Sequence, residues 1–137
     1  MSSSSAELQK LVRDTLVAKA EIMALANGVY DNIPTAPFGS KTAYISFGPE
    51  DTVEDDAECI VGLEMTMQID VWSRAVGAVE CKRLTDLVRK ALHRKPLVLT
   101  DNALVDALVD ITRVFRDPDG TTSHGVVTAT FRVEEPA

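Results

Sequence analysis

The sequence predicts an α+β domain: a mostly antiparallel β-sheet with two α-helices packed on one face and a closing β-hairpin at the C-terminal end. Apolar residues recur every three or four positions in residues 6–26 and 75–93, which is typical of amphipathic helices. In residues 60–72 and 103–133 apolar and polar residues alternate instead, as in strands that bury one face. Because the order is helix, strands, helix, strands, an antiparallel sheet with the helices on one side is favoured.

The composition is that of an ordinary globular protein. With 137 residues, the chain is long enough for a single domain, residues 1–137, to bury a core without metal or disulfide bonds, and residues 1–5 are expected to be a flexible N-terminus. No apolar run approaches the roughly 20 residues of a membrane span, so no membrane partner is expected. The net charge of −7 argues against a protein whose main task is to bind nucleic acid, because phosphate contacts need clustered Lys and Arg. The polar N-terminus lacks the basic start and apolar core of a secretory signal, which favours a cytoplasmic product.

The first helix is expected to begin after Ser5, whose hydroxyl can cap it, and to end at Asn27-Gly28, where Gly28 suits a left-handed position. A short extended piece, Val29–Asp31, follows. Two prolines then exclude helix from residues 32–40 and predict a surface loop. The apolar stripe of the helix consists of Leu8, Leu11, Val12, Thr15, Ala18, Ile22 and Leu25.

Residues 42–48 predict a strand that ends at Gly48-Pro49. The stretch Glu50–Glu58 that follows has six carboxylates and no base, so mutual repulsion predicts a solvated, mobile loop. A divalent cation held by these oxygen ligands is the alternative, although the stretch lacks the Asp/Asn-Gly-Glu spacing of a calcium loop.

The clearest predicted strand covers residues 60–72, with its odd-numbered row toward the core. Trp72 falls on the polar row, so it is expected to cover the sheet edge or to pack beneath a loop. A second helix, residues 75–93, should end before Pro96, and residues 97–99 predict a short strand. The buried row of the strand comprises Val61, Leu63, Met65, Met67, Ile69 and Val71.

The C-terminal part predicts a hairpin around the turn Asp117-Pro118-Asp119-Gly120. Pro118 presets φ at the second position of a β-turn, and Gly120 accepts a positive φ without steric cost. Before the turn, residues 102–110 favour a strand, although the spacing of Leu and Val there also fits a helix. This strand is expected to bury Val105, Ala107, Val109 and Ile111 and to change phase at residues 113–115, through a bulge or the end of the half-buried segment. After the turn, Val127, Ala129, Phe131 and Val133 should face inward.

No catalytic motif stands out. The sequence has no Gly-x-Ser-x-Gly elbow, Gly-rich phosphate loop or His-Glu-x-x-His motif. Nothing places a nucleophile beside His93 or His124, so helix-end charge and turn hydrogen bonding are their expected roles. Cys59 and Cys81 are too isolated for a disulfide framework or a zinc site and are expected to be small buried or half-buried hydrophobes. We therefore expect no catalytic residue, no cofactor and no metal.

Four stretches together resemble a known family. They are Val29-Tyr30-Asp31 before a proline-bearing loop, Tyr44–Gly48, Val71-Trp72-Ser73-Arg74 before a helix, and Arg116–Gly120 followed by His124-Gly125-Val126. In this order, over nearly the whole chain, they resemble the tail terminator, or tail completion, proteins of long-tailed bacteriophages and gene transfer agents. The last two of these stretches, Val71–Arg74 and the hairpin segment from Arg116, rarely occur together in one sequence.

The resemblance implies a structural virion protein rather than an enzyme. Such a protein forms a ring, usually a hexamer, that sits on the last ring of the tail tube, stops its growth and offers a surface for joining the head. The implied partners are further copies of the chain, the major tail tube protein and a head-completion or connector protein. Assembly would occur in the bacterial host cytoplasm, with a final place at the head-proximal end of the tail.

DNA would then pass through the lumen of the ring without specific binding. Lys or Arg side chains facing the lumen would bind the DNA phosphates, so carboxylates are expected there instead. The alternative for each candidate carboxylate is a solvated surface position without a role in the lumen. The basic side of the second helix, Lys82, Arg83, Arg89 and Lys90, is expected to face outward or into subunit contacts. The candidates are Asp51, Glu54, Asp55, Asp56 and Glu58 for a lumen or subunit-interface loop, Glu64 and Asp70 for a lumen strand face, and Asp117, Pro118, Asp119, Gly120 and His124 for the hairpin turn.

The competing class is a small α+β enzyme, ligand-binding or interaction module unrelated to tails, with Tyr44, Trp72, His124 and the acidic loop around a pocket. The sequence lacks the convergent acid, base and nucleophile of an enzyme. A hexamer-sized species in light scattering would favour the ring, whereas a strict monomer whose melting shifts with a small molecule would favour the pocket.

Overall fold

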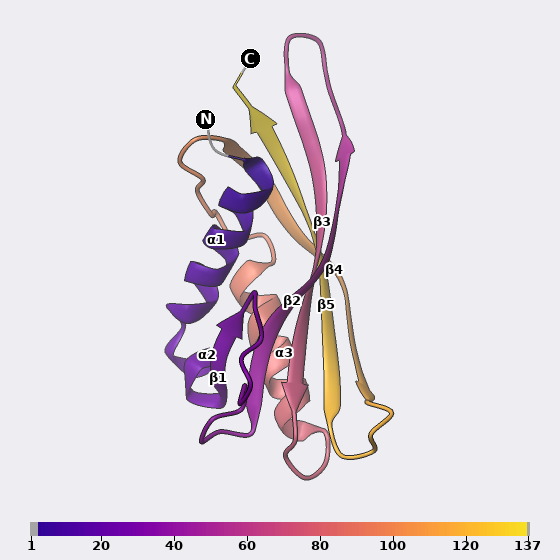
Figure 1. Ribbon diagram of the computed structural model, residues 1–137. Helices are drawn as coiled ribbons and strands as arrows, with labels where there is room; N and C mark the ends of the chain where they lie inside the picture. Colours follow the sequence, from indigo (N-terminus) through magenta and orange to yellow (C-terminus); the bar gives the residue numbers. More distant parts are fainter. Residues whose placement is uncertain (1–2, 137) are drawn as a thin grey trace.

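The computed structural model describes residues 3–136 and confirms the α+β fold (Figure 1). Five strands form one sheet in the order β1-β2-β3-β5-β4, in which β1 pairs with β2 in parallel and every other pair is antiparallel. The helices cover one face of the sheet and leave the other face open (Figure 1). In chain order the elements are α1 (Ser4–Val17), α2 (Ala20–Leu25), β1 (Ala26–Tyr30), β2 (Ala43–Glu54), β3 (Val61–Ser73), α3 (Val79–Leu92), β4 (Ala103–Arg116) and β5 (Ser123–Glu135).

The first predicted helix is two helices in the structure. Ser3 rather than Ser5 caps α1, because its hydroxyl oxygen accepts a hydrogen bond from the Ala6 N–H at 3.3 Å. The helix then breaks before α2, where Lys19 has an extended backbone with φ −86° and ψ 109°. The next segment is strand β1, so Asn27-Gly28 lies inside a strand and does not end a helix. Of the expected flexible N-terminus, residues 1–2 lie outside the described residues, and residues 4–5 are helical.

Strand β2 continues past Gly48-Pro49, where the sequence predicted its end. A register shift between Phe47 and Glu50 accommodates Pro49, which has no N–H to donate to a neighbouring strand. Beyond the shift, Glu50 pairs with Met67 and Glu54 pairs with Leu63. About half of the predicted acidic loop is therefore strand, and the β2–β3 hairpin extends beyond the helices (Figure 1).

The core lies between the helices and the inward rows of β3 and β5. Both rows face the helices as predicted. The exception is Val61, which is 38% exposed because the β2–β3 hairpin extends beyond the helices at this point. Helix α3 begins at Val79 rather than near residue 75, and residues 97–99 form no strand. The side chains that fill the core include Leu8, Val12, Leu16, Met65, Met67, Ile69, Val71, Leu84, Val88, Leu92, Val127, Ala129, Phe131 and Val133.

The closing hairpin has the predicted turn. The Gly120 N–H donates to the Asp117 carbonyl at 2.9 Å, and Gly120 has φ +76°. Residues 103–116 are strand rather than helix. The phase shifts come earlier than predicted, between Leu104 and Asp106 and between Val109 and Ile111, so Ala107 is buried but Val105 and Ile111 are more than half exposed.

Candidate functional site

The most distinctive surface is the projecting arm, defined here as residues 51–64 of the β2–β3 hairpin. It carries three large exposed apolar side chains, Val53, Ile60 and Val61, of which Val53 is 63% exposed. Its tip is a defined turn, because Ala57 and Ile60 exchange backbone hydrogen bonds of 3.2 and 3.0 Å and Cys59 has φ +64°. Cys59 is exposed there, contrary to the prediction that it is buried or half-buried. Exposed apolar groups on a projecting hairpin are typical of a contact surface.

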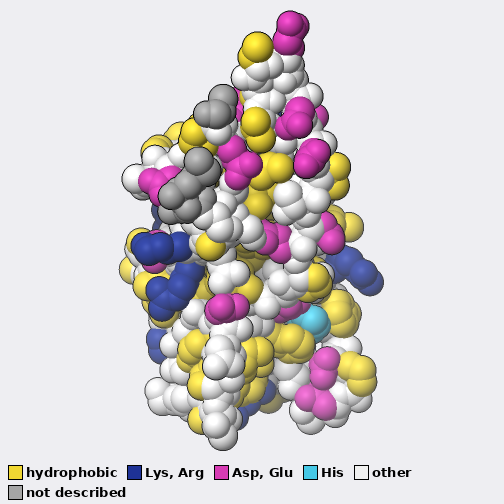
Figure 2. Space-filling view, turned by 45° about the horizontal axis from the view of Figure 1, so that its top comes forward, with side chains coloured by type: hydrophobic (Ala, Val, Ile, Leu, Met, Phe, Trp, Pro, Cys, Tyr) yellow, Lys and Arg dark blue, Asp and Glu magenta, His cyan; other side chains and the backbone are white. Residues whose placement is uncertain are grey.

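The arm also carries the acidic residues predicted for a lumen or interface. Cross-strand pairing of Asp51 with Thr66 and of Val53 with Glu64 places Asp51 and Glu64 on the open face of the sheet. Asp56 instead has a local role, since its Oδ1 accepts the Gly62 N–H at 3.0 Å. Figure 2 shows acidic side chains recurring along the projecting end of the molecule.

Asp70 does not belong to this acidic surface. It is 7% exposed, and its Oδ1 lies 2.7 Å from His124 Nε2 and 2.9 Å from the Gln68 side-chain nitrogen. The carboxylate is thus enclosed and partnered, which corrects its assignment to a solvent-facing lumen row. Glu64, further along the same strand face, is exposed.

An aromatic stack surrounds the Asp70–His124 pair on the open face of the sheet. The His124 ring stacks on Trp72 with 3.8 Å between centroids, and Tyr44 stacks on the other side of Trp72 at 6.2 Å. The Trp72 indole N–H donates to Ser46 Oγ at 3.0 Å, so its polar group has a partner. The residues of the alternative pocket therefore pack against one another, while the acidic arm tip lies at the end of the molecule (Figure 1).

The hairpin turn satisfies its own polar groups. Asp119 accepts hydrogen bonds from the N–H groups of Thr121 and Thr122 at 2.9 and 2.8 Å and from the Thr122 hydroxyl at 2.8 Å. The bond from the Thr122 N–H is the main reason that the pKa of Asp119 lies below its ordinary value. Asp117, Pro118 and Gly120 shape the same turn, whereas His124 belongs to the stack on the sheet.

The outer edge of β4 is the longest sheet edge, and it is only partly open. His93 and Arg94 cover its middle: the Val109 N–H donates to His93 Nδ1 at 2.9 Å, and the Arg94 N–H donates to the Ala107 carbonyl at 2.7 Å. From residue 110 to 116 the edge has no strand beside it among the described residues, and Ile111 and Phe115 are exposed there. Such an edge can take up another strand.

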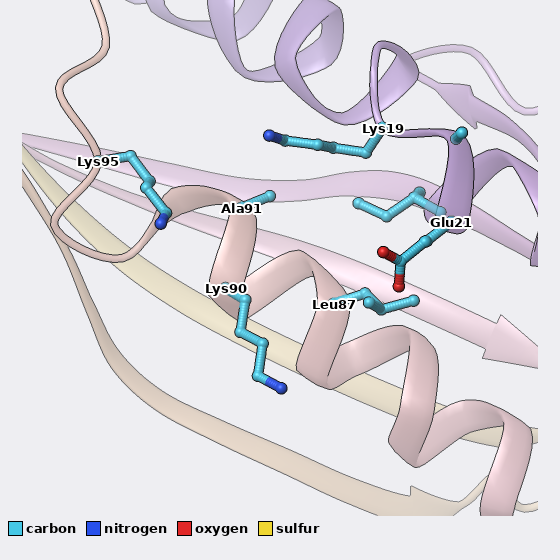
Figure 3. Close-up of a pocket in the computed structure, with 8 residues that line it drawn as sticks. Lys19, Glu21, Leu87, Lys90, Ala91 and Lys95 are labelled. Carbon is cyan, nitrogen blue, oxygen red and sulfur yellow. The ribbon is translucent and has the colours of Figure 1, made fainter.

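A hollow of about 420 Å³ lies between α2 and the end of α3 (Figure 3). We call it the basic hollow, because Lys19, Lys90 and Lys95 line it. This hollow was not predicted from the sequence, because the helix break that places Lys19 opposite α3 has no Pro or Gly to signal it. Of the predicted basic face of α3, only Lys90 reaches the hollow, and its other lining residues are Ala20, Glu21, Ile22, Leu87 and Ala91.

Residues 3–136 contain neither a metal-binding cluster nor a membrane-spanning helix. No group of three His, Cys, Asp or Glu side chains is placed to hold a metal ion. None of the helices in this part of the chain has the length and apolar character needed to cross a bilayer.

Comparison with known proteins gives consistent matches over nearly the whole chain. A family model described as "Tail completion protein gp17" matches residues 10–134. The tail completion protein gp17 of Bacillus phage SPP1 is 25% identical over 130 residues, which cover 94% of this chain and 93% of that protein. A chain of the solved structure titled "Virion of native gene transfer agent (GTA) particle" aligns with a TM-score of 0.85 and 28% identity, over 98% of this chain and 99% of that chain.

Proposed function

Because the chain belongs to the tail completion protein gp17 family, and so is a structural protein of the virion tail, we propose that it forms a ring that caps the tail tube. The ring has six copies. It ends polymerisation of the major tail tube protein below it and offers its other surface to a head-completion or connector protein. The observation that carries this proposal is the projecting arm, which extends beyond the helices with both its faces exposed.

A ring subunit needs two different surfaces that fit each other. In a closed ring each copy contacts the next through a heterologous interface, one patch on one copy and another patch on its neighbour. The chain offers several unlike surfaces for such a contact: the arm tip, with exposed Ile60 and Val61, the free part of the β4 edge, residues 110–116, and the basic hollow. Apolar groups at these places lose contact with water when copies associate, which stabilises the ring by about 25 cal/mol for each Å² buried.

The open face of the arm, with Asp51 and Glu64, faces the lumen of this ring. Both carboxylates lie on one side of the β2–β3 hairpin, and neither forms an ion pair within the described part of the chain. A carboxylate surface repels DNA phosphates, so the duplex passes without being bound. Asp55, Asp56 and Glu58, at the tip, belong to the contact between copies.

Removal of the gene from the particle that encodes the chain tests the proposal. Tails made without the chain should be longer than normal and variable in length, and heads should fail to join them, as measured by electron microscopy. Wild-type chain supplied in trans should restore both normal length and joining. Tails of normal length joined to heads in its absence would contradict the proposed function.

A further inference from the structure

We infer that the basic hollow of one copy receives the arm tip of the neighbouring copy. This inference rests on the proposed ring and names one of its contacts. In Figure 1 the arm tip and α2, which forms one wall of the hollow, lie at opposite ends of the molecule, so one copy cannot bring them together. Two copies can, and the contact is heterologous, as ring closure requires.

The hollow combines positive charge with an apolar floor. Ile22, Leu87 and Ala91 form the floor, and Figure 3 shows Lys19 and Lys95 extending over one end of it. Glu21 also lines the hollow, near Leu87, so three lysines and one carboxylate face its interior. Lys90 Nζ has an intrahelical partner, Asp86 Oδ2 at 3.0 Å. Lys19 and Lys95 have no ion-pair partner within residues 3–136, although the chain as a whole carries seven more carboxylates than Lys and Arg side chains. Unpaired lysines over an apolar floor suit an acidic segment with an apolar side chain.

The arm tip has this chemistry. Glu58 lies in the turn between Ala57 and Ile60, Asp55 comes just before this turn, and no hydrogen bond or ion pair engages either carboxylate in the described chain. Ile60, which closes the turn opposite Ala57, is 43% exposed. A volume of about 420 Å³ is far larger than a single ion needs and accommodates a turn of this kind.

The net charge of the chain favours this pairing. Two copies that each carry −7 repel each other, and a contact that brings opposite charges together offsets part of this repulsion. The lysines of the hollow meeting Asp55 and Glu58 do so, and the same arrangement disfavours contact of two tips or two hollows. The charges thus select the head-to-tail orientation of neighbouring copies.

Disulfide trapping tests the contact directly, with the native Cys59 at the tip as one partner. The variant Lys95→Cys adds the other partner in the hollow, and Cys81 is buried and does not interfere. On tail tubes, mild oxidation should link Lys95→Cys copies into a ladder of multimers on a non-reducing gel. The matched control Lys82→Cys, on α3 but outside the hollow, should give no ladder. A ladder from Lys82→Cys and none from Lys95→Cys would overturn the inference.

A charge exchange separates this inference from the proposed ring. Lys19→Glu with Lys95→Glu, or Asp55→Lys with Glu58→Lys, should each weaken assembly about tenfold or more, and the four changes together should restore it. If wild-type chain forms no ring on tubes, the proposed function fails. If wild-type rings form but the combined variant is no better than either pair, the inference fails while the ring stands. It also fails if the lysine variant still forms rings but no longer binds tubes, because the hollow would then receive the tube protein.

Discussion

Glu7 joins helix α1 to the segment that leads into β4. Its carboxylate accepts hydrogen bonds from the N–H groups of Thr100, Asp101 and Asn102 at 3.2, 2.8 and 3.2 Å and from the Asn102 side chain at 3.0 Å. The bond from the Asp101 N–H is the largest cause of a pKa for Glu7 below its ordinary value. One side chain therefore holds together two segments that are more than 90 residues apart.

Glu7→Gln should lower the melting temperature at neutral pH. Because the pKa of Glu7 is lower in the folded chain than in the unfolded chain, its stabilisation is present above the unfolded value, about 4.3, and is lost as the pH falls through the folded value. The difference in melting temperature between wild type and Glu7→Gln should therefore shrink below about pH 4. Glu58→Gln, at the arm tip, is the control and should melt like wild type at every pH. A constant difference for Glu7→Gln would contradict the assigned role.

At the residue scale, the alternation of apolar and polar residues predicted which side chains are buried, but not which side chains contact each other across strands. The rows containing Met67 and Phe131 were predicted as core because a period of two determines which face a residue occupies. The Asp70–His124 pair was not predicted, because it depends on which residues of β3 and β5 lie opposite each other. Only the register supplies that information, and no single strand contains it.

At the scale of elements, Gly125 permits the close approach of α3 to the sheet. A Cβ at this position would overlap Thr85 Oγ1 and would lie 3.3 Å from both Cys81 Sγ and Val71 Cβ. Gly125→Ala should therefore destabilise the fold by about 1–3 kcal/mol, as overpacking does. Adding Thr85→Ala removes the worst overlap and should recover a substantial part of the loss in denaturant unfolding. A double variant as unstable as Gly125→Ala alone would show that α3 is not held at this distance by the glycine.

The end of the projecting arm, residues 55–62, should be removable without disturbing the core. Replacing residues 55–62 with Asn-Gly joins the opposed residues Glu54 and Leu63 by a two-residue hairpin turn. We expect this variant to melt within a few degrees of wild type, because the removed residues lie beyond the helices and outside the core cluster. It should, however, fail to assemble on tail tubes in sedimentation. Normal assembly of this variant would exclude the arm tip from the contacts between copies.

The elements that the sequence mispredicted share a physical cause. The extension of β2 past Pro49 and the break before α2 both depend on tertiary contacts: pairing with β3 in the first case and renewed burial of Ile22 in the second. Local signals pointed the other way, since Gly48-Pro49 usually ends a strand and residues 18–20 are good helix formers. The turn at Pro118, by contrast, is determined by its own residues and was predicted correctly.

At the scale of the whole molecule, the proposed lumen surface makes a prediction about DNA. Asp51→Lys with Glu64→Lys should leave tail length normal, slow DNA ejection from completed particles and give the purified ring a DNA affinity that falls steeply with salt. Asp14→Lys with Asp31→Lys makes the same change in net charge away from the arm and should change none of these. Equal effects of the two variants would indicate a response to net charge alone, which would contradict the lumen assignment.

The central claim, a ring of six copies at one end of the tail tube, is tested most directly by cryo-electron microscopy of purified tail tubes mixed with the chain. We expect a disc at a single end of each tube, with six-fold symmetry and the mass of six copies of the 14.9 kDa chain. Capped tubes should also stop growing when further tube protein is added. Bare tube ends, or chain bound along the sides of tubes that continue to grow, would contradict the account.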